Sequence, residues 1–361
     1  MDERLTLIAQ YRAGDVPMVE LCRRAGVSRK TAYKWLARYV VEGRAGLIDR
    51  SRAPHVQVRQ TPDWVVKRLV AFKQQHPSWG PKKLVAALRR RDAQVAWPAP
   101  STVSAILDAH GLVKRRKRRQ HVPPYELPLQ PITAPNEVWT ADFKGQFKTG
   151  RDYCYPLTIA DGFSRFVLGC EAYVELTRKL TQPGFQRAFE AYGLPQTIRT
   201  DNGPPFANRG LGISRLSAWW IKLGIRHERI EPGCPEQNGR HERMHRSLKA
   251  DTANPPANSL EAQQRRFDRW RQEFNYERPH EALDLRPPAD LYVVSGRRYP
   301  ERLPEITYPS HFRVRQVRQN GAFKWHSTLI YASASLVHEP VGLELIDDGR
   351  WRVYFAHQPI G

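Results

Sequence analysis

The N-terminal part of the chain repeats apolar residues at the three- and four-residue spacing of amphipathic helices. Met18–Ala25 predicts a short helix, Gly26 a turn, and Lys30–Tyr39 a second helix for which Ser28 is a natural N-cap. This is the helix-turn-helix pattern, whose second helix enters the major groove of DNA. We therefore expect a helix-turn-helix DNA-binding domain over residues 1–53. The expected core residues are Val27, Ala32, Trp35 and Leu36, and the expected DNA contacts are Ser28, Arg29, Lys30 and Lys34.

A second stretch of helical periodicity, residues 62–113, predicts another helix-turn-helix domain. Trp64–Lys73 is amphipathic, and Lys82–Arg91 resumes the helical pattern after a break that contains prolines. Thr102–His110 forms a third helical stretch, with Ser101 as its expected N-cap. The apolar stripes predict the core of this domain. The outward residues that could contact DNA are Lys82, Lys83, Ser101, Thr102 and Ser104.

The middle of the chain changes to the two-residue alternation of strands, interrupted by helical stretches. Three strands come first, with a turn at Asp161–Arg165 between the second and the third. A helix, a short strand, a second helix, a fifth strand and two more helices follow, and this order matches the RNase H-like α/β fold over residues 136–292. The expected strands are Glu137–Gly145, Cys154–Ala160, Phe166–Val174, Thr197–Thr200 and Arg226–Ile230, and the expected helices are Leu180–Tyr192, Ser214–Leu223, Glu236–Ala250 and Ser259–Tyr276.

The last segment, residues 304–361, predicts short strands only. The expected strands are Phe312–Val317, Phe323–Tyr331, Gly342–Ile346 and Arg350–Phe355. Asp348-Gly349 is a hairpin signal between the last two strands. A small β-barrel of the SH3-like kind is the expected form. The whole chain is thus expected to be multidomain, with an all-α N-terminal region, an α/β core and a C-terminal β-barrel.

The charge balance is strongly basic, with 58 Lys+Arg against 36 Asp+Glu and a formal net charge of +22. Such a balance concerns binding partners rather than the fold. Nucleic acid is the expected partner, because bound cations release condensed counterions from the phosphate backbone. A ribosomal or otherwise adhesive basic protein is the alternative, but 40% hydrophobic residues and ten Trp favour packed cores.

Six consecutive cations, Lys114, Arg115, Arg116, Lys117, Arg118 and Arg119, follow the second helical domain. Runs of this kind are often solvated tails. Between two DNA-binding domains and an α/β core, this run is expected to follow a phosphate backbone or a minor groove. Residues 114–135 as a whole predict a basic, proline-rich linker.

The four cysteines are Cys22, Cys154, Cys170 and Cys234. None of them forms a C-x-x-C pair, so zinc knuckles and dithiol redox motifs are not expected. The chain shows no secretory signal pattern, and no apolar run approaches the 18 residues of a membrane span. We expect a cytoplasmic, nucleoid-associated bacterial protein with reduced thiols and no membrane partner.

Three acidic residues stand in distinctive neighbourhoods along the core. Asp142 lies in Val138–Gly145 (VWTADFKG), Asp201 opens the segment DNGPPF, and Glu236 lies in the segment PGCPEQNGRHER. Magnesium takes oxygen ligands, and a pair of such ions can hold the attacking and leaving oxygens of a phosphoryl displacement. On these segments the chain resembles the DDE transposases and integrases of bacterial insertion sequences, whose cores are similar to retroviral integrases. Residues 202–235 separate the last two acids, at the short edge of the family's spacing.

The resemblance implies a DNA transposase that binds the terminal inverted repeats of an insertion sequence and catalyses DNA strand cleavage and strand transfer. Asp142, Asp201 and Glu236 would be the catalytic residues and the ligands of two Mg²⁺ ions, which Mn²⁺ could replace. Double-stranded DNA, both element ends and target, would be the partner of a homo-oligomer. Arg240 and Arg243 would contact DNA. Glu242 lies off the helical face of Glu236 and would make a structural ion pair.

Two other functions remain open from the sequence. A domesticated DNA-binding regulator could keep the fold without chemistry, but it would not need three converging carboxylates. A metal-dependent nuclease of the RNase H type could use the same acids, but the two N-terminal DNA-binding domains favour sequence-directed action on DNA.

Overall fold

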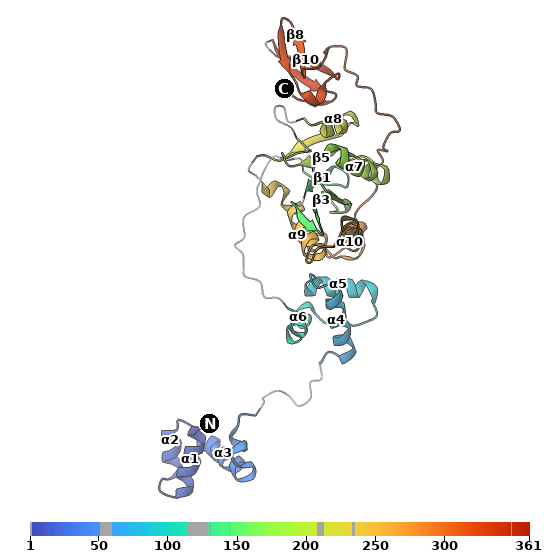
Figure 1. The fold of residues 1–361 in the computed structure, drawn as a ribbon. Coiled ribbons are helices and arrows are strands. Elements are labelled where there is room, and N and C mark those ends of the chain that lie inside the picture. Colours follow the sequence, from blue (N-terminus) through green and yellow to red (C-terminus); the bar gives the residue numbers. More distant parts are fainter. Residues whose placement is uncertain are drawn as a thin grey trace. The chain divides into compact units, whose positions relative to one another are not determined.

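The computed structural model describes residues 2–50, 60–113, 129, 131–143, 145–207, 213–232, 235–347 and 349–361. The chain divides into two compact units, Met1–Thr61 and Pro62–Gly361 (Figure 1).

The first unit is a small helical domain. Its helices are α1 (Asp2–Ala13), α2 (Met18–Arg24) and α3 (Arg29–Glu42), followed by the 3-10 helix η1 (Gly43–Leu47). Ser28 caps α3, since its side chain accepts a hydrogen bond from the Thr31 amide at 3.2 Å. Ala32 is fully buried, with Val27, Trp35 and Leu36 packed partly buried against the same cluster. The predicted helix-turn-helix pair, its cap and its core residues are therefore confirmed.

The second unit begins with three helices, α4 (Asp63–Gln75), α5 (Pro81–Arg91) and α6 (Pro100–Ala109). Their apolar faces enclose a separate core that contains Trp79, Leu84 and Leu107. The predicted N-cap of the third helix is wrong by two residues. Ala99 is the cap and Pro100 begins the helix, because the fixed φ of proline suits the first helical position, where no amide donor is needed.

The α/β core is built on a six-stranded mixed sheet. Its strands are β1 (Val138–Phe143), β2 (Phe147–Thr149), β3 (Asp152–Asp161), β4 (Val167–Tyr173), β5 (Thr197–Thr200) and β6 (Arg226–Arg229). They follow the order β2-β3-β1-β5-β6, with β4 also paired to β3. The β1–β3 and β3–β4 pairs are antiparallel, whereas β1–β5 and β5–β6 are parallel. The predicted strands are present, and β2 is an additional short strand.

Helices cover both faces of this sheet. Successive side chains of a strand point to opposite faces, and apolar residues on both faces are buried by packing against helices. The helices α7 (Arg178–Tyr192) and α8 (Arg215–Lys222) pack on the face that buries Trp139 and Ala141. The helices α9 (Gly239–Thr252) and α10 (Leu260–Gln272) pack on the opposite face around Cys154 and Val167. Both faces of the sheet are thus buried, and only its edges and strand ends remain for a site.

The segment before α9 differs from the prediction. Glu236 does not open an α-helix, since Pro235–Asn238 forms the 3-10 helix η2 and α9 begins at Gly239. Three short helical elements end the core: α10 passes into the π-helix η3 (Glu273–Glu277), and the 3-10 helices η4 (Glu281–Leu283) and η5 (Pro288–Asp290) follow.

The C-terminal strands form two sheets. A four-stranded sheet has the order β12-β11-β10-β7, and β8 pairs with β9 in a separate hairpin. The predicted single strand 323–331 is wrong, because the chain reverses at His326, which adopts a positive φ of 51°. A closed barrel is not confirmed among the described strands. These are β7 (Arg313–Gln316), β8 (Ala322–Trp325), β9 (Thr328–Tyr331), β10 (Pro340–Asp347), β11 (Arg350–Phe355) and β12 (Gln358–Pro359), with the 3-10 helix η6 (Ala334–Leu336) between β9 and β10.

The cysteines within the described residues carry buried thiols. Cys22, Cys154 and Cys170 are all free of disulfides, and burial raises the pKa of Cys154 to about 12. Among the described helices, none combines the length and apolar character that a bilayer crossing requires.

Candidate functional site

The first two predicted carboxylates lie at one edge of the sheet, on neighbouring parallel strands. Asp142 is the penultimate residue of β1, and Asp201 follows directly after β5. The register pairs Thr140 with Arg199, so continuing it by two residues places Asp142 level with Asp201. Neighbouring strands are about 4.8 Å apart. The fold therefore brings these two acids to the same strand ends, although 58 residues (143–200) separate them in sequence.

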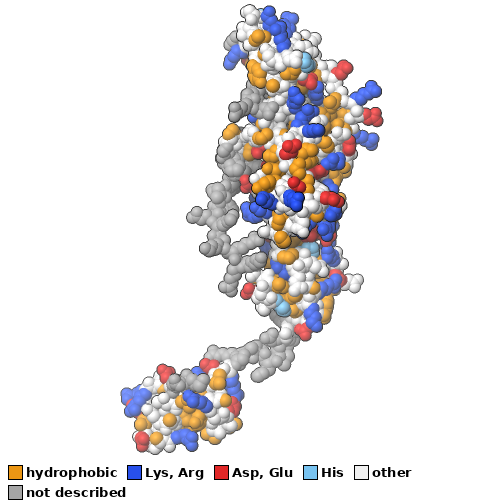
Figure 2. Space-filling view, in the orientation of Figure 1, with side chains coloured by type: hydrophobic (Ala, Val, Ile, Leu, Met, Phe, Trp, Pro, Cys, Tyr) orange, Lys and Arg blue, Asp and Glu red, His pale blue; other side chains and the backbone are white. Residues whose placement is uncertain are grey.

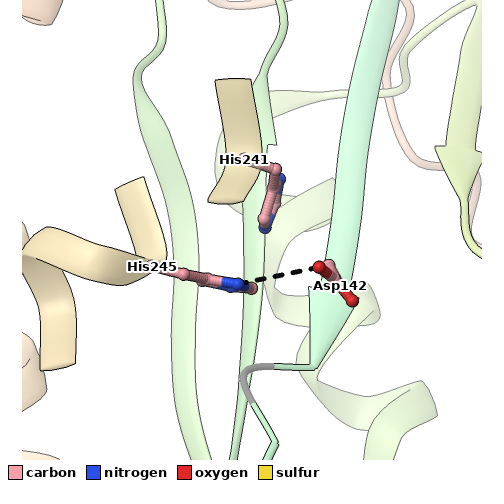
Figure 3. A group of neighbouring side chains, drawn as sticks. All are labelled: Asp142, His241 and His245. Carbon is pink, nitrogen blue, oxygen red and sulfur yellow. Dashed lines mark ion pairs between the residues drawn. The ribbon is translucent and has the colours of Figure 1, made fainter. Parts of the chain in front are cut away.

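Asp142 is held by side chains of η2 and α9. The Asn238 side-chain amide donates to Asp142 Oδ2 at 3.3 Å, and His245 Nδ1 lies 3.6 Å from the same oxygen. Figure 3 shows Asp142 facing His245, with His241 beside both. Alternation along β1 explains the contact, because Trp139 and Ala141 enter the core on the other face and Asp142 points toward α9.

Two histidines of α9 join Asp142 in a buried polar network. His241 and His245 are four residues apart, so they lie on one face of the helix. Thr158 Oγ1 lies 2.6 Å from Nε2 of each histidine, and Thr140 Oγ1 lies 2.8 Å from His241 Nδ1. The ligand atoms of Asp142, His241 and His245 all lie within 4.8 Å of one another, which is a spacing that one metal ion could bridge.

Asp201 lies in a partly enclosed position. Burial raises the pKa of its carboxyl, and the hydrogen bond that Oδ1 accepts from the Gly203 amide at 3.2 Å opposes this shift. The neighbouring Asn202 donates to the Ile230 carbonyl at 2.7 Å and so links the loop to the end of β6. A partly buried carboxylate at a strand end is well suited to a cation partner.

Two glutamates near the start of α9 are placed differently. Glu236 lies on η2, and its side chain is outside the described part of the chain. Glu242 is exposed in the first turn of α9, four residues after Asn238 and three before His245. His245 contacts Asp142 Oδ2, and Glu242 lies three residues before it on α9, so Glu242 borders the face of α9 that contacts Asp142.

Basic side chains surround the same end of α9. Arg240 and Arg243 are both exposed, and Arg240 donates to the Gly162 carbonyl at 3.1 Å. Burial lowers the pKa of Arg165, and the cations of Arg240 and Arg243 lower it further. The three arginines are thus close enough to repel one another, and an anion near them would relieve that repulsion.

The predicted DNA contacts of the first unit are accessible. Ser28, Arg29, Lys30 and Lys34 are all exposed along the N-terminal half of α3. Lys and Arg side chains are visible on the surface of both units in Figure 2.

The predicted DNA contacts of the second unit are only partly brought together. Lys82, Lys83 and Ser101 line one shallow pocket of about 370 Å³ at the starts of α5 and α6, together with Glu281. Lys82 Nζ lies 3.7 Å from a Glu281 oxygen, and burial, followed by the nearby Arg278, lowers the pKa of Lys83 to about 8. Thr102 is exposed and Ser104 is half-buried on α6. The basic run Lys114–Arg119 lies outside the described residues.

The sequence prediction missed the histidines and threonines around Asp142. Their signal was present: two His at positions i and i+4 of one helix, and Thr140 two residues before Asp142 in the alternation of β1. Thr158 carried no such signal, because its position opposite Asp142 depends on the pairing of β1 with β3.

The element order, the mixed sheet and the acidic strand ends define the class of protein. This is an α/β core of the RNase H-like fold, joined to helix-turn-helix domains. Two models described as "Integrase core domain" match residues 132–235 and 223–288. Models described as "Helix-turn-helix domain" and "Homeodomain-like domain" match residues 3–55 and 31–107.

Curated relatives come from insertion elements and retroviruses. An uncharacterized 31.7 kDa protein of insertion element IS407 from Burkholderia multivorans is 27% identical over 62% of this chain and 79% of that protein. An uncharacterized 39.2 kDa protein of insertion element IS476 from Xanthomonas euvesicatoria is 30% identical over 62% of this chain and 63% of its own length. The Gag-Pol polyprotein of feline leukemia virus is 32% identical over 32% of this chain and 6% of the polyprotein.

Solved integrase structures also align with the chain. The catalytic core domain of HTLV-2 integrase in complex with magnesium aligns with 44% of this chain and 98% of its own, at 19% identity and a TM-score of 0.33. The simian T-cell lymphotropic virus intasome in complex with a PP2A regulatory subunit aligns with 82% of this chain and 97% of its own, at 19% identity and a TM-score of 0.39. The domain matches and the insertion-element relatives agree with the resemblance seen in the sequence: the chain carries an integrase core together with helix-turn-helix domains, and it is similar to proteins of insertion elements.

Proposed function

We propose that the protein is a DNA transposase that binds the terminal inverted repeats of an insertion sequence and catalyses DNA strand cleavage and strand transfer. The observation that carries the proposal is the placement of Asp142 and Asp201 at level positions on the ends of neighbouring parallel strands. The two N-terminal helical domains and the net charge of +22 support DNA as the substrate.

The acids at this edge fit a hard divalent cation. Asp142 and Asp201 offer carboxylate oxygens, the ligand type that Mg²⁺ prefers, and we propose a pair of Mg²⁺ ions at the site. Bound ions of this kind supply charge stabilisation and a lowered pKa for the attacking hydroxyl. Asn238 holds one Asp142 oxygen, so the carboxylate is oriented before any ligand arrives. The arginines Arg240 and Arg243 are proposed to contact the DNA backbone beside the acids.

Two glutamates compete for the role of the third carboxylate. The spacing and neighbourhood of Glu236 predict it, while Glu242 lies on α9 three residues before His245, which contacts Asp142 Oδ2. A strand-transfer assay on a pre-cleaved DNA end separates the two.

We expect one of Glu236→Gln and Glu242→Gln to reduce strand transfer by at least about a hundredfold, since loss of one preorganised charge costs on the order of 10²–10³ in rate. The other variant should transfer strands at a rate within a few fold of that of the parent protein. Equal, small effects of both would remove the three-carboxylate site from the proposal.

The basic run Lys114–Arg119 is proposed to contact phosphates between the second helical domain and the core. Replacing all six residues by Gln should weaken end binding without changing which sequence is preferred, because phosphate contacts position a protein and base contacts specify. The slope of log K against log salt should fall by roughly three to four units if four of the six contact DNA, at about 0.9 per contact. An unchanged slope in a titration by fluorescence anisotropy would assign the run to solvent or to another protomer.

We propose the following working division of the chain, with a homo-oligomer assembling on the DNA ends. Residues 1–53 and 62–113 form two DNA-binding domains, and residues 114–135 form the linker. Residues 136–292 form the catalytic core, and residues 304–361 form a C-terminal β domain. The rival function, a DNA-binding regulator without chemistry, predicts end binding but no strand transfer. Incubation of the full chain with a labelled pre-cleaved end, a target plasmid and Mg²⁺ decides between them.

A further inference from the structure

The contact between Asp142 and His245 has an unusual length. His245 Nδ1 lies 3.6 Å from Asp142 Oδ2, in a place where the histidine side chain is only 2% exposed. A nitrogen-to-oxygen hydrogen bond is normally about 2.7–3.2 Å long, so this separation is too great for one. It is close to the spacing of two ligands of a single ion: with bonds of about 2.1 Å, ligand atoms are roughly 3.0–3.4 Å apart for angles between octahedral and tetrahedral. The ligand atoms of Asp142, His241 and His245 all lie within 4.8 Å of one another.

The hydroxyl groups around the histidines indicate which nitrogen of His245 carries its proton. Thr140 Oγ1 donates to the Ala160 carbonyl at 3.3 Å, so it can accept from His241 Nδ1–H. His241 Nε2 is then an acceptor, and it can take the single proton of the Thr158 hydroxyl. Thr158 Oγ1 in turn accepts from Nε2–H of His245.

The Thr158 hydroxyl also lies within 3.3 Å of the Asp142 backbone carbonyl. If its proton goes there instead, Thr158 Oγ1 accepts from Nε2–H of both histidines. In both arrangements the neutral ring of His245, the form that binds a metal ion, is protonated on Nε2, and its Nδ1 presents a lone pair toward Asp142 Oδ2. Two lone-pair atoms that face each other at this distance are stabilised by a cation between them. The opposite tautomer would place an N–H at 3.6 Å from the carboxylate and leave both backbone carbonyls without their hydroxyl donors.

We infer that His245 is a nitrogen ligand of the metal ion held by Asp142, with Thr158 as the group that fixes its tautomer. The arrangement is that of a metal-binding histidine whose other ring nitrogen donates to a fixed acceptor. This inference deepens the proposed function and rests on it for the presence of a metal at Asp142. His241 belongs to the same network through Thr140 and Thr158 and has a positioning role.

A nitrogen ligand changes which ions the site prefers. Mg²⁺ favours a shell of oxygen atoms, whereas imidazole suits transition metals. The Asp142 site should therefore hold Mn²⁺ more tightly than Mg²⁺, and the difference should depend on His245. A longer bond from the metal ion to the His245 nitrogen, or the loss of this ligand, should weaken Mn²⁺ binding much more than Mg²⁺ binding.

The test measures metal binding without any DNA reaction. The full chain is loaded with Mn²⁺, and electron spin echo spectroscopy detects nitrogen coupled to the ion, with ¹⁵N-histidine labelling to assign the signal to imidazole. We expect coupling to one histidine in the parent protein and its loss in His245→Gln. Calorimetric titration should show Mn²⁺ affinity at least about tenfold weaker in that variant, with Mg²⁺ affinity changed by less than about twofold.

Two further variants keep the result interpretable. His76→Gln replaces another buried histidine, located in the loop between α4 and α5, and should retain the coupling and the affinity. Thr158→Val keeps the size of the side chain and all histidines but removes the acceptor of Nε2–H, so the coupling should persist with weaker Mn²⁺ binding. If His245→Gln does not fold, the Mn²⁺ affinity of Thr158→Val still tests the inference.

A parent spectrum without histidine nitrogen, or one that His245→Gln leaves unchanged, would overturn the inference. Neither result bears on the proposed transposase function, which fails separately if Asp142→Asn retains strand transfer.

Discussion

Replacing Asp142 or Asp201 by Asn is expected to reduce DNA strand transfer by at least about a thousandfold, because each change removes a charge from the proposed metal site, which would stabilise developing charge on phosphate oxygens. Both acids lie at the ends of neighbouring parallel strands, so neither is replaceable by the other. The measurement is transfer of a pre-cleaved DNA end into a target plasmid, with Mg²⁺ and separately with Mn²⁺.

The Asn variants are chosen because they should fold. Asn at position 142 keeps an oxygen that can accept the Asn238 amide, and Asn at position 201 keeps an acceptor for the Gly203 amide. End binding and the thermal unfolding midpoint should therefore stay close to those of the parent. Asp161→Asn is not a suitable control, since the buried Asp161 carboxylate organises the turn through Asn136 and Ser164. Asp108→Asn on the exposed end of α6 is suitable, and it should transfer strands normally. Full activity of either acidic variant would refute the proposed catalytic site.

Combined replacement of Arg29, Lys30 and Lys34 by Ala is expected to weaken binding to the proposed terminal inverted repeats by at least about a hundredfold. Specific base contacts contribute about 1–3 kcal/mol each, and the N-terminal part of a recognition helix makes them. All three side chains are exposed on α3, so their loss should not disturb the core around Ala32. If Arg29, Lys30 and Lys34 instead contact phosphates, the slope of log K against log salt should fall by about 2.7, at 0.9 per contact.

The matched control lies on the neighbouring helix. Arg23 and Arg24 are also exposed cations, but both pair with Glu20 on α2. Arg23→Ala with Arg24→Ala removes two charges from the same small domain and should change the preference for the repeat by only a few fold. If the control weakens specific binding as strongly as the α3 variant, the effect is one of net charge and α3 is not the recognition helix.

Much of the fold was predictable because it depends on local patterns. The helix pair of the first unit follows from the apolar spacing around Ala32 and the cap at Ser28, and both are confirmed. Strand β5 falls on the predicted residues Thr197–Thr200, because a short, fully buried strand is bounded by clear turn residues. These features are determined by neighbours in sequence.

Two of the wrong predictions fall where the apolar pattern does not mark the boundary of an element. His326 turns the chain within a run that alternates like one strand, and β8 and β9 are two strands of a hairpin. Glu236 precedes α9 by one short 3-10 turn, since the helical pattern of the sequence does not distinguish the two kinds of helix. Both errors concern short connections, in which a few backbone angles decide the path.

The sequence by itself determined the class of this protein: the helix-turn-helix domains, the α/β core, and two of the acids at strand ends. Periodicity, caps and acidic motifs are local, so they can be read without coordinates. Only the tertiary structure decided what surrounds Asp142. Pairing of β1 with β3 places Thr158 opposite Asp142, and packing of α9 on the sheet brings His241 and His245 to both. Such contacts join residues that are far apart in the chain. They form because apolar faces of the helices and strands are buried against one another, and the sequence pattern does not show which faces pack together.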